Sequence, residues 1–152
     1  MTSTDRLPFA QWADINRTDR FISVEPLSGY RRTLRDDGGY VIYLAPHTTD
    51  HELGRALLEC LGKSRFIWPP DEPQFFDADR IMQSYRSWQK DVMRRYGHKT
   101  KREAYKAMDW RRVERSEVGF RFSRTNATSR NIGGIFRRVA LSSFRRRSTR
   151  SR

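Results

Sequence analysis

The distribution of charge along the chain separates two unlike stretches of sequence. Residues 118–152 contain ten arginines and no lysine, aspartate or glutamate. The whole chain has 31 basic and 18 acidic side chains, so the preceding residues are nearly balanced and the tail carries most of the net charge of +13. Segments rich in arginine and serine repel themselves and seldom pack. We therefore expect a folded domain followed by an irregular basic tail.

Length and composition allow one hydrophobic core before that tail. A chain of 152 residues with 36% hydrophobic side chains is the size of a single domain. The lone cysteine excludes an intramolecular disulfide and a multi-thiolate zinc site. No apolar run approaches the ~20 residues that cross a bilayer, and the first residues carry no apolar signal segment. We expect a cytoplasmic protein with an N-terminal arm at 1–19, a domain at 20–117 and the tail at 118–152.

Strand-like runs recur through the predicted domain. Residues 21–26 have the pattern of a short strand that ends at its proline. Residues 30–34 and 40–44 flank an Asp-Asp-Gly-Gly turn at 36–39, and Asp-Gly between strand-like runs is typical of a hairpin. A last strand is expected within 113–122, where apolar and polar side chains alternate.

Helix signals lie between these strands. Thr49 and Glu52 form a capping box before an apolar stripe with helical spacing. Asp77 caps a longer helix that ends at the next glycine, and its aromatic stripe is expected to face the core. Thr100 and Glu103 open a shorter third helix. The chain is thus predicted to be α+β: a single domain with an antiparallel or mixed β-sheet and two to three helices packed on it.

A proline-rich connection, 64–76, joins the two longer helices. Its three prolines disfavour a regular element, yet five large apolar side chains lie within it. Two interpretations stay open. The aromatic residues can pin the loop to the core, or they can form an exposed recognition surface, since aromatic side chains next to acids are good interface anchors.

Side chains that could carry catalysis are scarce. His47 and His51 flank Asp50, but Thr49 caps the helix between them, so the pair cannot form an aligned His-Glu-x-x-His zinc site. Cys60 falls on the buried stripe of that helix and is expected to be an inert core residue. The chain has no Gly-x-Ser-x-Gly elbow, Walker loop or Gly-x-Gly-x-x-Gly motif. We predict no enzyme, no metal, no cofactor and no small-molecule substrate.

One segment resembles the signature of a known family. Residues 96–108 are similar to the "YGYKTKR-x-x-YK-x-M" segment of bacterial contact-dependent growth inhibition (CDI) immunity proteins, and residues 53–57, 64–66 and 75–77 agree with it, so the resemblance covers about 20–115. The matching motif residues are Tyr96, Gly97, Lys99, Thr100, Lys101, Arg102, Tyr105, Lys106 and Met108. His98 replaces the second tyrosine of the motif.

The resemblance implies a function that the residues alone do not. Such proteins are cytoplasmic antidotes that bind the C-terminal domain of a large secreted toxin, often a nuclease, and block it. A nuclease presents a basic substrate groove, so acids are candidates to meet it. The most available acids are Asp36, Asp37, Asp50, Glu52, Asp71, Glu72, Asp77 and Asp79, although each also suits a turn or a helix cap.

The tail departs from the family pattern. Family members continue beyond the position of Trp110 into further strands and another helix, whereas this chain enters the Arg/Ser tract. Abrupt loss of every acid is what a slipped reading frame in a G+C-rich gene would produce, so we expect residues after about Glu117 to differ from the family's native ending. The alternative function is nucleic-acid binding through the arginine-rich tail. A basic amphipathic helix on an anionic surface, with Ile135, Phe136 and Val139 on its apolar side, is a third possibility.

Overall fold

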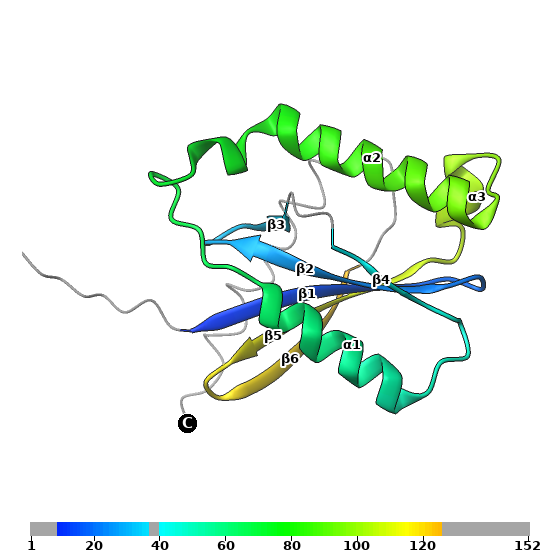
Figure 1. Ribbon diagram of the computed structural model, residues 1–152, viewed down its shortest axis with the longest axis horizontal. Coiled ribbons are helices and arrows are strands. Elements are labelled where there is room, and N and C mark those ends of the chain that lie inside the picture. The colour runs from blue at the N-terminus through cyan, green and yellow to red at the C-terminus, as the bar shows by residue number, and fades with distance from the viewer. Residues whose placement is uncertain (1–8, 37–39, 126–152) are drawn as a thin grey trace, which may run out of the picture.

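The computed structural model describes residues 9–36 and 40–125 and shows one α+β domain (Figure 1). Its strands pair antiparallel in the order β3-β2-β1-β5-β6, and β4 also pairs with β2. The predicted fold class is confirmed. The strands are β1 (Ala10–Arg17), β2 (Ile22–Gly29), β3 (Thr33–Arg35), β4 (Ile42–Leu44), β5 (Asp109–Ser116) and β6 (Gly119–Thr125), and the helices are α1 (Asp50–Lys63), the 3-10 helix η1 (Pro73–Phe76), α2 (Ala78–Tyr96) and α3 (Lys101–Tyr105).

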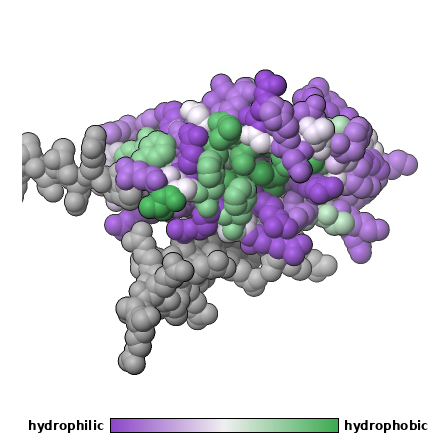
Figure 2. Space-filling view, turned by 90° about the horizontal axis from the view of Figure 1, so that it is seen from below, coloured by the Kyte–Doolittle hydropathy of each residue, from purple (hydrophilic) through white to green (hydrophobic). Residues whose placement is uncertain are grey.

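The sheet lies between α1 on one face and α2 on the other (Figure 1). The α1 face is apolar: Ala13, Val24 and Val113 from three strands pack against Leu57 and Leu61 of the helix. Figure 2 views the molecule from the α1 side and shows an apolar band across the middle of a largely hydrophilic surface. The buried cluster between the sheet and α1 is the main hydrophobic core of the described residues.

The opposite face of the sheet carries buried charge. Asp14 and Glu25 lie side by side on β1 and β2 and are 2% and 1% exposed. The guanidinium of Arg112 donates to both carboxylate oxygens of Asp14, at 2.8 and 2.9 Å, and Arg35 donates to Glu25 at 2.6 Å. Burial raises the pKa of Glu25, while the neighbouring Arg35 opposes that shift.

Strands β3 and β4 do not form the predicted hairpin. Both pair with β2: Leu34 lies opposite Ser28, and Ile42 lies opposite Val24. Each has only three residues, and the eight-residue β2 offers one edge long enough for both. The sequence predicts that Pro26 ends the strand, but β2 continues through it. Pro26 lies between the stretches of β2 that pair with β4 and with β3, where this edge has no partner strand.

Two strands fall in segments that the sequence assigns to the arm and the tail. Residues 10–17 form β1, which lies in the middle of the sheet between β2 and β5. The predicted strand at 113–122 is instead a hairpin of β5 and β6, with Glu117 and Val118 at its turn. Polar residues on one face of β1 hide that strand from an alternation test, whereas the alternation at 113–122 continues into β6 and does not reveal the turn between the two strands. The rest of the tail, 126–152, lies outside the described residues.

The helix caps confirm the sequence signals. Thr49 accepts from the backbone N–H of Glu52, whose carboxylate accepts in turn from that of Thr49. Asp77 accepts from two backbone N–H groups at the start of α2, and Gly97 ends the helix in the left-handed conformation at φ 67°.

Cys60 is fully buried in the α1 core, and burial raises its pKa to about 12. The side chain therefore lies in the core, as predicted.

Candidate interaction surface

The loop after α1 is held to the end of β2 by its backbone. The N–H of Gly29 donates to the carbonyl of Arg65 at 3.0 Å, and the N–H of Ile67 donates to the carbonyl of Gly29 at 2.8 Å. In an extended chain successive side chains point to opposite sides. Ile67 is accordingly buried against Leu34 and Phe75, while its two aromatic neighbours face outward.

Those neighbours form an exposed aromatic cluster of Tyr30, Phe66 and Trp68. Phe66 and Trp68 are 48% and 43% exposed. Both rings meet the ring of Tyr30 edge-on, with centroid distances of 5.5 and 5.1 Å. Rings held against one another lose little further freedom on binding, which makes them good anchors for a partner. Ile67 and Phe75 thus pin the loop to the core, while the aromatic cluster stays exposed.

Arg65, the residue before Phe66, holds two of the predicted acids near the aromatic cluster. Arg65 donates to both carboxylate oxygens of Asp36, at 2.8 and 3.2 Å, and to Glu72 at 3.2 Å. The hydroxyl of Ser28 donates to Asp36 at 2.9 Å. Asp71 is exposed in the turn that follows Trp68. The tertiary structure therefore brings three of the eight predicted acids beside an aromatic cluster.

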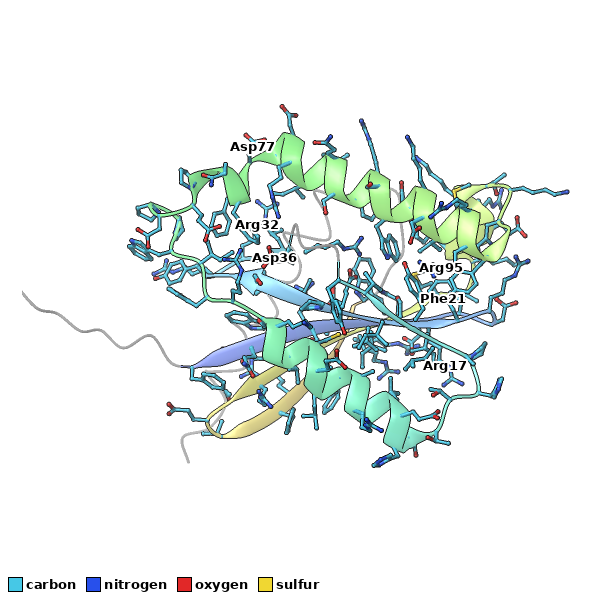
Figure 3. All side chains as sticks on the ribbon, in the orientation of Figure 1. Arg17, Phe21, Arg32, Asp36, Asp77 and Arg95 are labelled. Carbon is cyan, nitrogen blue, oxygen red and sulfur yellow. The ribbon has the colours of Figure 1, made fainter. Side chains whose placement is uncertain are left out.

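The remaining predicted acids are placed differently. Asp77 and Asp79 lie at the N-terminus of α2, at the same end of the molecule as Asp36 (Figure 3). Asp50 and Glu52 lie at the N-terminus of α1, at the opposite end (Figure 1). Hydrogen bonds from the Thr48 hydroxyl and the Thr49 backbone lower the pKa of Glu52. Asp37 lies outside the described residues.

The family motif builds a turn and part of the core. Tyr96 stacks on Phe21 with a centroid distance of 4.3 Å, Gly97 ends α2 and Thr100 caps α3. Tyr105 stacks on Trp88, and Met108 packs in the same cluster. His98 is buried. The charged members of the motif, Lys99, Lys101, Arg102 and Lys106, are all exposed.

Tyr30 lies far in the sequence from Phe66 and Trp68, and no sequence pattern links it to them. Tyr30 belongs to a predicted strand, and nothing near it indicates the loop at Phe66 that it contacts. The pairing follows from the bridge between Gly29 and Phe66. A signal is present only in the loop itself, where large aromatic residues stand among prolines and acids.

The described residues also bear on the metal, membrane and nucleic-acid predictions. In residues 9–36 and 40–125, no group of three or more His, Cys, Asp or Glu side chains could hold a metal ion. No helix in the described part is long and apolar enough to cross a membrane. The nucleic-acid alternative depends on the arginines of the tail, most of which lie beyond residue 125.

The chain is similar to characterised and solved proteins of bacteria. It is 34% identical over 109 residues to Immunity protein CdiI-YPIII of Yersinia pseudotuberculosis serotype O:3 (strain YPIII), a match that covers 64% of this chain and 62% of the relative. The chain thus spans less than two thirds of that relative's length.

Two solved structures share the fold. One is described as a protein of unknown function, NMB0488, from Neisseria meningitidis, with a TM-score of 0.74, 25% identity and coverage of 80% of this chain and 76% of the other. The second is a CdiA-CT/CdiI toxin and immunity complex from Yersinia pseudotuberculosis, with a TM-score of 0.64, 27% identity and coverage of 70% and 68%.

The CDI immunity protein family model matches residues 11–129. The match includes β1, which the sequence assigns to an arm, and it runs past Glu117 through β6. The match covers most of the 152 residues, so this chain belongs to the CDI immunity protein family.

Proposed function

We propose that this protein binds and neutralises the toxin domain of its cognate CDI system by forming a stoichiometric complex in the cytoplasm. Family membership supports the proposal, as does the similarity to an immunity protein solved in complex with a toxin. Such a protein acts by covering its partner and needs no catalytic group of its own.

The observation that carries the proposal is the exposed aromatic cluster with acids beside it. Interface energy is concentrated in a few large side chains, and charges around them steer the partner into register. Phe66 and Trp68 supply such anchors, held by backbone bonds to Gly29. Asp71 and Glu72 supply negative charge within the same loop, which suits the basic groove of a nuclease toxin.

The first experiment measures the affinity of the full chain for the toxin domain encoded beside it. We expect stoichiometric, nanomolar binding, and we expect Trp68→Ala to weaken it about tenfold or more, as truncation of an interface anchor does. Leu58→Ala is the control: this apolar side chain is similarly exposed, at 50%, but it lies on α1. If the Trp68→Ala variant binds the toxin domain as tightly as the wild type, the aromatic cluster is not part of the interface.

The second experiment tests whether the partner groove is basic. The double variant Asp71→Asn, Glu72→Gln should slow association and flatten its salt dependence, because rim charges act mainly on the encounter rate. Asp50→Asn, which removes one negative charge at the other end of the molecule, is the control and should leave the rate unchanged. Protection of RNA or DNA from the toxin by one equivalent of this protein would establish a nuclease partner.

A further inference from the structure

Two phenylalanine rings are exposed on the last strand of the sheet. Phe120 and Phe122 of β6 are 52% and 59% exposed. They stand opposite Arg115 and Val113 of β5. Because Val113 is buried against α1, both rings project from the α1 face of the sheet, the side shown in Figure 2. Helix α1 packs mainly on β1 and β2, so the rings stay uncovered by it.

The same face of the β5–β6 hairpin is positively charged. Three arginines share it with the two rings: Arg111, Arg115 and Arg124. Arg111 and Arg124 share the single carboxylate of Asp109, at 3.1 and 3.3 Å, so one of these two positive charges is in excess. Arg115 donates to the uncharged side chain of Gln11. We call the two rings and the three arginines the aromatic–arginine face.

The aromatic–arginine face lies away from the aromatic cluster. In the strand order, β1 and β5 separate β6 from β2 and β3, and Tyr30 directly follows β2. Beyond β6 the chain continues with eight arginines and no acidic residue in 126–152. A partner of this edge of the sheet is therefore expected to be negatively charged.

The two rings indicate which kind of negative partner fits. Side chains two residues apart on a strand lie about 7 Å from one another, so each ring can stack on a separate flat group. Unpaired bases offer such groups, and the phosphates that link them suit arginine. An acidic protein surface would pair with the arginines but would offer no repeated flat partner to the rings.

We propose that the aromatic–arginine face binds single-stranded nucleic acid. Phe120 and Phe122 stack on unpaired bases, and the arginines beside them contact the phosphates. Base faces and phosphates are common to RNA and DNA, so the face recognises the unpaired strand and not its sugar. The proposal does not rest on toxin binding.

The test measures binding of the full chain to a fluorescein-labelled single-stranded DNA of about 16 nucleotides by fluorescence anisotropy. The double variant Phe120→Leu, Phe122→Leu should bind at least about tenfold more weakly, because it loses two stacking contacts and keeps every charge. Phe66→Leu is the control, since that ring is similarly exposed, at 48%, but belongs to the aromatic cluster. Wild-type affinity in the folded double variant overturns the proposal, because the arginine tail alone would then account for binding.

A duplex of the same length separates stacking from charge. Its bases are paired and stacked on one another, so the rings cannot reach them. The wild type should bind the single strand more tightly than the duplex. An arginine tail acting alone would favour the duplex, which has the higher charge density, so duplex binding that is as tight or tighter overturns the proposal.

Arg124 and Arg121 supply a matched pair of charge variants. Both lie on β6, with side chains 66% and 57% exposed, and each pairs with one carboxylate. Arg121 stands opposite Glu114, on the other face of the sheet. Arg124→Gln should lower the slope of log affinity against log salt by about one, as loss of a phosphate contact does, and Arg121→Gln should leave it nearly unchanged. Equal slopes in the two variants would contradict the proposal.

A protein contact is the other outcome of the test. If the Phe120→Leu, Phe122→Leu variant loses affinity for the toxin domain and keeps its affinity for single-stranded DNA, the face is a protein interface and the nucleic-acid proposal is wrong. Trp68→Ala gives the converse control, because it should weaken toxin binding and leave DNA binding unchanged. The two proposals therefore fail independently.

Discussion

Individual buried charges in this protein are matched in pairs. Asp14 is 2% exposed and receives two hydrogen bonds from Arg112. Asp14→Asn leaves the guanidinium without its counter-charge, so it should lower the free energy of unfolding by about 3 kcal/mol. Asp109→Asn is the control, because Asp109 pairs with Arg111 and Arg124 at the surface and should cost under about 1 kcal/mol. Urea denaturation measures both, and equal losses would contradict the assignment.

A second prediction at the residue scale concerns Tyr43. Its hydroxyl donates to Asp91 at 3.2 Å, and burial, followed by the Asp91 charge, raises its pKa to about 12. The folded pKa exceeds the ordinary 10.0, so the stability that Tyr43 contributes is present below pH 10 and is lost as the pH rises toward 12. A tyrosinate absorbance titration of wild type minus Tyr43→Phe should show a group that ionises near 12.

Asp91→Asn tests the cause of that shift. Without the carboxylate charge, Tyr43 should ionise at lower pH than in the wild type, although burial keeps its pKa above 10. A tyrosine titration that is identical in both proteins would show that Asp91 does not act on the Tyr43 hydroxyl.

Among the elements, the α2–α3 turn depends on a left-handed backbone conformation at Gly97. Gly97 adopts φ 67°, and a Cβ at this position would meet no atom of the described residues beyond its chain neighbours within 4 Å, so Gly97→Ala should cost about 1 kcal/mol from backbone strain alone. Gly54 lies inside α1 with equally open surroundings, and Gly54→Ala should instead stabilise by about 0.5–1 kcal/mol. Thermal unfolding should show opposite shifts, and two shifts of the same sign would contradict this account.

At the scale of the whole molecule, the candidate acids separate into two ends. The aromatic cluster, Glu72 and Asp77 lie at one end, and Asp50 with the α1 cap lies at the other (Figure 1). Hydrogen exchange in the toxin complex should therefore show new protection at 28–36 and 65–72 and none at 48–54. Protection confined to 48–54 would place the toxin at the α1 end instead.

Only part of the candidate site could be predicted from the sequence. Asp71, Glu72 and the exposed aromatics of the loop could be proposed from composition, because prolines and acids flank them. The contact of Tyr30 with Phe66 and the pairing of Asp36 with Arg65 could not. Both depend on the loop lying along the end of β2, and no local pattern encodes that path.

Local patterns in the sequence were sufficient to predict the helices and the family. Capping at Thr49, Asp77 and Thr100 acts on N–H groups within three residues, so each cap is visible in a short stretch of sequence. The position of β1 in the middle of the sheet and the sharing of one edge of β2 by β3 and β4 emerge only in three dimensions. Strands pair with whichever strand edges are available once the chain is compact. The paired residues are far apart in the sequence, so no local pattern specifies them.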